Sequence, residues 1–230
     1  SEYPMDEQSL DKAGEKLRKI YELYLKDQDV KTYFAIVPDK NAWAFEAEGQ
    51  NVINYSELYA RMQAETEDFA SYIELDDLLD MESYYKTDAH WRQEKIYPVA
   101  QRIAEAMGCE LTAEYDKAVA NDSFIGAYGR QSDLAMEPEE LIYLTNEALD
   151  GCIVTDYASE DERYVTTGVY TIASAASEDG EGYDMFLDGA KSLLTIENPA
   201  STTDKELIIF RDSFGSSIAP FFTEVYRKVT

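Results

Sequence analysis

Residues 207–216 read LIIFRDSFGS, and this stretch decides the fold class that we expect. Its first four residues are apolar, which is typical of a strand buried on both faces, as in a parallel sheet covered by helices. From Phe214 onward apolar residues recur at helical spacing, so Ser213 falls where a strand passes into a helix. N–H groups at the start of a helix can stabilise an oxyanion, so this junction suits a nucleophile. The plainer alternative is that Asp212 or Ser213 only caps the helix.

A second stretch, YYKTDAHW at residues 84–91, contains His90, the single histidine among 230 residues. An unperturbed histidine titrates near neutral pH, so His90 is the candidate general base, and Asp88 can orient its ring. With Ser213 as nucleophile these residues predict a Ser-His-Asp triad. The alternative is that His90 is structural or solvated and that Thr87 or Asp88 caps a helix.

The rest of the chain predicts a single α/β domain over 1–230 with a β-rich inserted subregion at about 121–194. Apolar periodicity predicts helices at 6–26, 55–69 and 93–107, the last kinked by Pro98 and ended by Gly108. Apolar runs predict strands at 32–37, 71–75 and 192–196, and Val229 with Thr230 is expected to begin another. Residues 126–130 (GAYGR) predict a hairpin turn rather than a phosphate-binding loop.

The charge balance limits the possible partners. The chain has 47 acidic and 20 basic side chains, a formal net charge of −27, which argues against nonspecific binding of nucleic acid or anionic lipid. No apolar stretch reaches the ~18 residues needed to span a bilayer. The sequence leaves the oligomeric state open, a monomer included.

No metal or other cofactor is expected. One histidine and two distant cysteines, Cys109 and Cys152, match no zinc motif, and the acidic run at 76–82 lacks the glycine turn of a calcium loop. The two cysteines are either free buried thiols, the reading we favour, or one disulfide.

Two of these segments carry a family resemblance. YYKTDAHW resembles the signature of the DHHW family of bacterial surface proteins, and FRDSFG at 210–215 with APF at 219–221 resembles its serine block. AIVPDK at 35–40, YDMFL at 183–187 and TIENP at 195–199 are further matches. The family is similar to SGNH-like proteins that O-acetylate alginate and other exopolysaccharides. Ala89 departs from the pattern, because it stands where the family name has its first histidine.

The resemblance implies an SGNH-like three-layer fold with a mostly parallel central sheet flanked by helices. It also implies an O-acetyltransferase or acetylesterase that acts on a cell-surface polysaccharide or another acyl ester. Asp88, His90 and Ser213 take the positions of orienter, base and nucleophile, and Asn198 becomes the candidate side-chain oxyanion donor beside the Ser213 N–H. The protein would be extracytoplasmic, cell-surface or secreted, with its export or anchor segment absent from this chain, which begins at Ser1.

The alternative function is a noncatalytic glycan-binding or adhesion domain that keeps the fold. The missing first histidine gives this alternative some weight. In either case, candidate substrate contacts lie close to the triad in sequence or in the β-rich subregion, where loops often bind substrate. They are Tyr85, Lys86, Tyr128, Arg130 and Arg211, although Arg211 could instead hold the carboxylate of Asp88 or Asp212.

Overall fold

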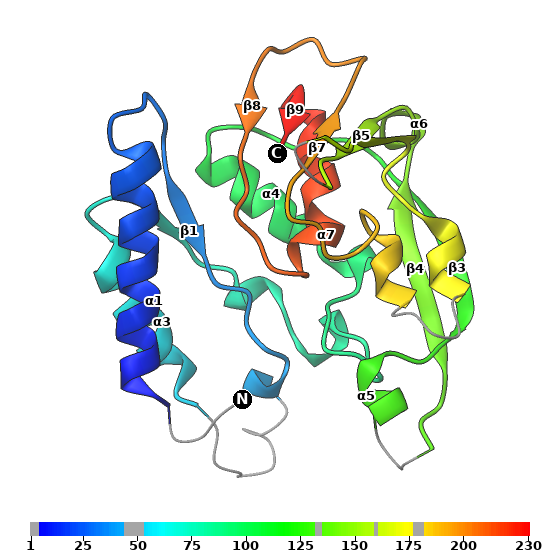
Figure 1. Ribbon diagram of the computed structural model, residues 1–230. Coiled ribbons are helices and arrows are strands. Elements are labelled where there is room, and N and C mark those ends of the chain that lie inside the picture. The colour runs from blue at the N-terminus through cyan, green and yellow to red at the C-terminus, as the bar shows by residue number, and fades with distance from the viewer. Residues whose placement is uncertain (1–4, 44–52, 132–134, 159–160, 177–181) are drawn as a thin grey trace. The chain divides into compact units, whose positions relative to one another are not determined.

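The structure is a computed structural model that describes residues 5–43, 53–131, 135–158, 161–176 and 182–230. It divides into two units, residues 1–81 and 82–230 (Figure 1). The single domain expected over 1–230 stays a prediction. No helix within the described residues is both long and apolar enough to cross a membrane.

The first unit contains the predicted helices and strands of the N-terminal third. Helix α1 (Glu7–Ile20) is capped by the Asp6 carboxylate and continues as the π-helical turn η1 (Tyr21–Leu25). Helix α3 (Tyr55–Thr66) packs beside α1 (Figure 1), and Arg18 of α1 donates to both carboxylate oxygens of Asp68 at 2.8 and 3.0 Å. Strands β1 (Tyr33–Ala35) and β2 (Ser71–Ile73) pair in parallel.

The second unit carries a five-stranded sheet with the order β6-β5-β7-β9-β8. Only β8 and β9 pair in parallel; β5–β6, β5–β7 and β7–β9 are antiparallel. A separate antiparallel pair is formed by β3 and β4, with register shifts along β3. The bounds of these strands are β3 (Asp116–Phe124), β4 (Glu139–Thr145), β5 (Ile153–Asp156), β6 (Tyr164–Thr167), β7 (Leu194–Glu197), β8 (Glu206–Leu207) and β9 (Lys228–Val229).

The predicted mostly parallel central sheet is therefore wrong. The length of the connections explains only part of this result: short links give antiparallel pairs, whereas long links, such as the segments 157–193 and 198–227 that separate β5 from β7 and β7 from β9, allow either direction. Residues 157–163 alone join β5 to β6, while β8 and β9 are joined by the longer segment 208–227 and do run in parallel. The predicted β-rich subregion supplies β5 and β6, which pair into the same sheet as β8 and β9.

Helices of the second unit pack on this framework. The predicted helix over 93–107, kinked at Pro98, is wrong: residues 93–95 form a separate 3-10 turn, and α4 begins only at Tyr97. Pro98 then lies in its first turn, which needs no N–H from proline. Gly108 adopts φ +76° just after α4, as its predicted helix-ending role requires. The helical segments are η2 (Asp76–Leu78) in the first unit, η3 (Met81–Ser83) at the boundary, and η4 (Gln93–Lys95), α4 (Tyr97–Ala106), α5 (Ala127–Gln131), α6 (Glu147–Asp150), η5 (Ile172–Ala176), η6 (Gly182–Met185), α7 (Gly215–Ile218) and η7 (Ala219–Glu224) in the second.

The core of the second unit lies where α4 and η7 meet. Their inward side chains are fully or almost fully buried. The ring of Tyr97 contacts that of Phe221 edge-on at 5.4 Å between centroids, and Tyr115 contacts both rings edge-on at 5.0 and 5.2 Å. Fully or almost fully buried side chains of this core include Ile96, Val99, Leu141, Leu149, Phe221 and Phe222. This packing fixes η7 and, through it, the short helix α7 that follows the candidate serine.

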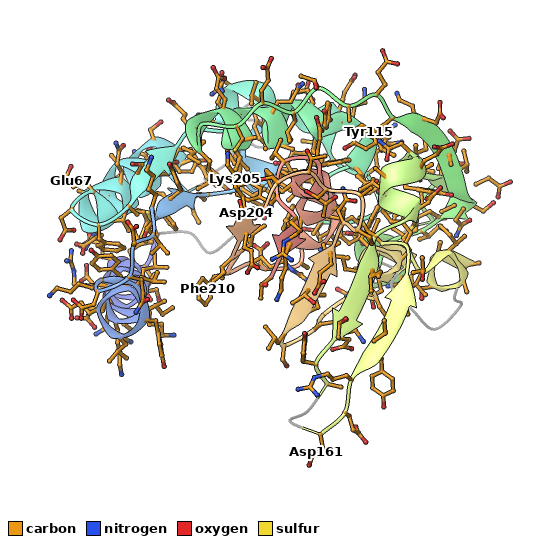
Figure 2. The ribbon with its side chains drawn as sticks, turned by 90° about the horizontal axis from the view of Figure 1, so that it is seen from above. Glu67, Tyr115, Asp161, Asp204, Lys205 and Phe210 are labelled. Carbon is orange, nitrogen blue, oxygen red and sulfur yellow. The ribbon has the colours of Figure 1, made fainter. Side chains whose placement is uncertain are left out.

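The strand expected at 207–210 is not buried on both faces. Ile208 is 61% exposed and Phe210, labelled in Figure 2, is 70% exposed, and only Glu206–Leu207 form a strand. An apolar run does not by itself reveal what covers it, which is why the sequence misled here. Two backbone hydrogen bonds hold this segment to Thr230, both at 2.8 Å. The Ile209 N–H donates to the Thr230 carbonyl, and the Thr230 N–H donates to the Leu207 carbonyl.

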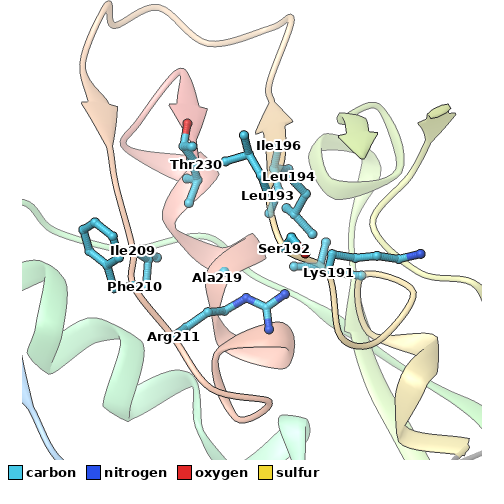
Figure 3. A pocket seen from close by; sticks show the side chains of 12 residues that line it. Lys191, Ser192, Leu193, Leu194, Ile196, Ile209, Phe210, Arg211, Ala219 and Thr230 are labelled. Carbon is cyan, nitrogen blue, oxygen red and sulfur yellow. The ribbon is translucent and has the colours of Figure 1, made fainter. Parts of the chain in front are cut away.

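A hollow of about 230 Å³ opens between the start of β7 and residues 209–211, next to Val229 and Thr230 (Figure 3). Its wall carries the side chains of Arg211, Ile209 and Leu194. Ser213, the candidate nucleophile, is not among the residues that line it.

Candidate active site

The segment 84–91 forms a closed loop that presents His90. Tyr84 and Trp91 pair as an isolated antiparallel bridge, and the Tyr85 N–H donates to the His90 carbonyl at 3.1 Å. One residue beyond the bridge, the Arg92 N–H donates to the Ser83 carbonyl at 2.8 Å. The loop is thus fixed at its base, and Asp88 and His90 lie at its tip.

Asp88 holds the imidazole of His90 in one orientation. Its Oδ1 accepts from the His90 N–H at 3.0 Å and from Nδ1 of the ring at 2.6 Å, while its Oδ2 accepts from the Ala127 N–H at 2.8 Å. Burial alone would raise the pKa of the Asp88 carboxyl, but these hydrogen bonds from His90 and Ala127 outweigh it and lower the pKa to about 2. Asp88 is therefore ionised at neutral pH, so Nδ1 carries the ring proton.

The other ring nitrogen faces the candidate nucleophile. His90 Nε2 lies 2.8 Å from Ser213 Oγ, within hydrogen-bond distance. Because Nδ1 is the protonated nitrogen, Nε2 presents its lone pair to the serine hydroxyl. The structure thus brings together all three residues of the predicted triad, from positions 123 residues apart in the case of His90 and Ser213.

Ser213 lies in a turn that Asp212 organises. The Phe214 N–H donates to Asp212 Oδ1 at 3.0 Å, and the Gly215 N–H donates to the Asp212 carbonyl at 3.2 Å. Asp212 therefore does cap this turn, as the plainer alternative held, while Ser213 itself is exposed with its hydroxyl at His90. The amides of Phe214 and Gly215 are thus both engaged with Asp212 within the turn.

Glu139 holds the loop 84–91 through hydrogen bonds and was missed by the sequence analysis. Its carboxylate accepts from the Lys86 N–H at 3.1 Å and from the N–H and hydroxyl of Thr87 at 2.7 and 2.8 Å. It also pairs with Arg92 at 3.1 Å. Glu139 begins β4, and nothing in its local sequence distinguishes it from the neighbouring acidic residues.

Gly126 and Ala127 form the wall behind Asp88. The Gly126 N–H donates to Thr87 Oγ1 at 3.0 Å, next to the Ala127 contact with Asp88. A Cβ atom at position 126 would overlap the Asp88 side chain and lie 2.7 Å from its Cγ, so glycine is needed for this close approach. The predicted hairpin turn at 126–130 is wrong, because residues 127–131 form the short helix α5.

The predicted substrate contacts have different environments. Tyr85 is fully buried and its ring packs edge-on against Phe124 at 5.1 Å, so it belongs to the core and cannot contact substrate in this structure. Lys86, in the loop 84–91, and Arg130 are exposed. Tyr128 is 38% exposed, and its N–H donates to the Thr87 carbonyl. Their substrate contacts stay predictions.

Two further predicted residues are held by contacts within the protein. Asn198 is buried, with Nδ2 donating to the Thr223 carbonyl at 3.0 Å and Oδ1 accepting from the Ala200 N–H at 3.0 Å, so its amide is occupied and it is a poor oxyanion donor. Arg211 donates through Nη1 to Ser216 Oγ at 2.7 Å and to the Asp212 carbonyl at 3.1 Å. Burial lowers the pKa of Arg211.

The two cysteines lie outside the triad. Cys109 and Cys152 are free thiols, one half-buried and one buried. Within the described part of the chain, no group of three or more His, Cys, Asp or Glu residues is placed to hold a metal ion. The Tyr183 ring stacks on the His90 imidazole, and the sequence analysis assigned no role to this contact.

Comparisons with known proteins find similarity in structure but not in sequence. No family model matches the chain, and no curated protein matches it significantly. A crystal structure of a DHHW family protein from Eubacterium siraeum DSM 15702 has a TM-score of 0.73 and 16% identity, covering 94% of this chain and 74% of that one.

Two structures of Bacillus cereus PatB1 are also similar. PatB1 alone has a TM-score of 0.76 at 19% identity, covering 99% of this chain and 81% of that chain. PatB1 with a sulfonyl adduct has a TM-score of 0.76 at 18% identity, covering 99% and 78%. The chain therefore shares its fold with a DHHW family protein, as the sequence resemblance predicted, and with PatB1.

Proposed function

We propose that this protein is an SGNH-like O-acetyltransferase or acetylesterase that acts outside the cytoplasm on a cell-surface polysaccharide. The observation that carries the proposal is the continuous chain of hydrogen bonds from Asp88 through His90 to Ser213, at 2.6 and 2.8 Å. Such a chain activates a hydroxyl that is otherwise too weak an acid to attack a carbonyl.

In the first half-reaction, Ser213 Oγ attacks the carbonyl carbon of an acyl ester while His90 Nε2 accepts its proton. The ester C–O bond then breaks, and the imidazolium returns the proton to the departing alcohol oxygen, leaving an acyl group on Ser213. Asp88 stabilises the imidazolium without taking the proton, consistent with its lowered pKa.

In the second half-reaction, His90 removes a proton from the acceptor hydroxyl, which attacks the acyl-serine carbonyl. The bond to Ser213 Oγ breaks and that oxygen regains the proton. A sugar hydroxyl as acceptor gives O-acetylation, and water gives ester hydrolysis. The Ser213 N–H is the proposed oxyanion donor, because the Phe214 and Gly215 N–H groups are engaged with Asp212.

The choice of substrate rests on the family resemblance together with the shared fold. The surface charge favours neutral or cationic acceptors, because a formal net charge of −27 repels a polyanionic polymer at low ionic strength. A neutral polysaccharide bearing free hydroxyls is therefore the first acceptor to test.

The test combines turnover with covalent labelling. Wild type, Ser213→Ala, His90→Ala and the control Ser71→Ala, which changes an exposed serine in the other unit, are incubated with p-nitrophenyl acetate, with and without a neutral oligosaccharide. We expect nitrophenol release in wild type and in the control, and a loss of at least about a thousandfold in both triad variants. A gain of acetyl mass on the oligosaccharide identifies a transferase.

A small sulfonyl fluoride provides a readout that does not depend on the natural acyl donor, and PatB1 with its sulfonyl adduct supports this choice. The reagent forms an S–O bond with an activated serine and releases fluoride. We expect one sulfonyl group on the peptide that contains Ser213 and none in His90→Ala. Labelling and turnover that both survive Ser213→Ala would refute the catalytic assignment and leave a noncatalytic glycan-binding domain.

A further inference from the structure

We propose that Tyr183 is a positioning residue that fixes the plane of the His90 imidazole and couples it to the helix that follows Ser213. Its expected effect on turnover rests on the proposed function, whereas its effect on the imidazole can be measured whether or not the protein is an enzyme. Tyr183 lies in η6, is 3% exposed and is remote in sequence from both residues that it connects.

The first contact is a stack between two rings. The Tyr183 and His90 ring centroids are 3.9 Å apart and their planes differ by 8°. His90 needs this constraint, because Nδ1 must point at Asp88 and Nε2 at Ser213 at the same time, and both directions lie in the ring plane. A rotation of the imidazole about its bond to Cβ would weaken both hydrogen bonds.

The second contact is a hydrogen bond from the Tyr183 hydroxyl to Ser217 Oγ at 2.7 Å. Ser217 lies in α7, four residues after the candidate nucleophile, and is fully buried. Burial raises the pKa of the Tyr183 phenol far above its ordinary value, so the hydroxyl stays protonated and donates at any working pH. The tyrosine therefore contacts the general base with its ring and the nucleophile's helix with its hydroxyl.

Ser217 also receives a bond from the residue next to His90. Trp91 Nε1 donates to the same Ser217 Oγ at 2.8 Å, and the Ser217 hydroxyl donates to the Phe214 carbonyl at 3.3 Å. Two accepted bonds and one donated bond use the full capacity of a hydroxyl. Ser217 is thus a buried junction at which the His90 loop, Tyr183 and α7 meet.

A separate bond holds α7 to the loop without Tyr183. Gln93 Nε2 donates to the Ser217 carbonyl at 2.7 Å, and Gln93 is fully buried. Removing the tyrosine ring should therefore leave α7 docked while freeing the imidazole. This makes the ring contribution separable from a general loss of structure.

The stack also favours the intermediate charge state of the proposed reaction. When His90 accepts the serine proton it becomes a cation, and the face of a tyrosine ring attracts a cation placed over it. Stabilisation of a charge that develops only during the reaction acts on kcat more than on KM.

The test uses the fact that His90 is the single histidine in the chain, so its imidazole protons give unambiguous NMR signals. In wild type we expect these protons to be shifted upfield by the ring current of Tyr183. Tyr183→Phe keeps the ring and should keep most of that shift. Tyr183→Leu removes the ring and should abolish it, whereas Ser217→Ala keeps the ring and removes the hydroxyl that bonds Tyr183, Trp91 and the Phe214 carbonyl.

In turnover assays we expect Tyr183→Leu to lower kcat by ~10- to 100-fold with KM little changed, since a displacement of about 1 Å at a reacting group costs about that much. Tyr183→Phe should lose only a few-fold. Tyr115→Leu is the matched control, because it removes a tyrosine from an aromatic cluster built on Tyr97 and Phe221 and leaves His90 untouched.

The outcomes are distinct. If Tyr183→Leu folds and leaves the His90 signals in their wild-type positions, the proposal is overturned. If Tyr183→Leu does not fold, wild type and Tyr183→Phe decide the question. His90 imidazole signals without an upfield ring-current shift in both proteins would overturn the proposal. If the signals respond as expected but wild type shows no Ser213-dependent turnover or labelling, the positioning role stands and the proposed function fails.

Discussion

Gly126→Ala is the substitution that tests most directly whether Asp88 must stay in place. The backbone of Gly126 is not in the left-handed region, so alanine brings no backbone strain, and the whole effect comes from its Cβ atom. That atom would lie 2.7 Å from Asp88 Cγ, whereas carbon atoms pack at roughly 3.5–4.0 Å. The same atom would come nearer still to Asp88 Cβ, which a side-chain rotation does not move, so the whole of Asp88 must retreat by at least about 1 Å.

The magnitude follows from that displacement. A shift of about 1 Å at a positioning group costs on the order of 100-fold in rate. Retreat also breaks the bond from the Ala127 N–H to Asp88 Oδ2, which is 2.8 Å long, and a hydrogen bond to a charged group is worth about 1.5–3 kcal/mol. We expect kcat/KM to fall about 100-fold and the free energy of unfolding to fall by about 1–3 kcal/mol.

The assay measures p-nitrophenyl acetate turnover and urea unfolding on the same preparations. Gly151→Ala is the control, because its Cβ would lie 3.3 Å from the Glu147 carbonyl oxygen and 3.7 Å from that of Ala148, which a small adjustment accommodates. Should Gly126→Ala fold normally and retain kcat/KM within twofold of the control, Asp88 would not be the orienter and the triad would have to be abandoned.

Three further predictions follow from the same contacts. The pKa of Asp88 is lowered from 3.8 to about 2, so its ionised form stabilises the folded state above pH 4 by about 2 kcal/mol, and this contribution disappears as the pH falls from 4 to 2. Unfolding of wild type and of Asp88→Asn across that pH range measures the contribution. Parallel curves of unfolding free energy against pH for the two proteins would contradict it. Glu139→Gln should weaken the hydrogen bonds to Lys86 and Thr87 and lower kcat/KM for the same substrate about tenfold, and Glu140→Gln is the neighbouring control. Equal kcat/KM in the two variants would show that the loop keeps its conformation without Glu139. Cys152 is fully buried and burial raises the pKa of its thiol, so a thiol reagent should modify only half-buried Cys109 in the native protein and both cysteines in urea; fast labelling of two thiols without denaturant would disprove this.

The chemistry of the site was more predictable from the sequence than its support. A single histidine leaves no choice of base, Asp88 lies two residues before it, and Ser213 was chosen by its place after an apolar run and by the family resemblance. Glu139 and Tyr183 could not be found in this way, because each acts through a contact with a residue more than 50 positions away and belongs to a common residue type. The contacts of Asn198 could not be predicted either, because an asparagine before proline shows nothing of the carbonyl that its amide meets.

The fold was predictable from the sequence where the local spacing of apolar residues determines an element. It was not predictable where the structure depends on which strands pair. Helices α1 and α3 lie where their apolar spacing indicated. The direction of neighbouring strands depends on which segments meet, and a run such as 207–210 reads the same whether it becomes a buried strand or an exposed segment. Short helices such as α5 are equally hard to foresee, because five residues carry no helical period.

The order of strands in the sheet has a consequence for how the molecule is made. Strand β9 lies between β7 and β8, so the segment that leads to Ser213 is joined to the sheet through residues 227–230. During synthesis these residues leave the ribosome after every other part of the site, and contacts between distant segments form slowly. Ser213 should therefore come into contact with His90 late in folding. The time course over which sulfonyl fluoride labelling of Ser213 recovers during refolding would then report when β9 pairs into the sheet.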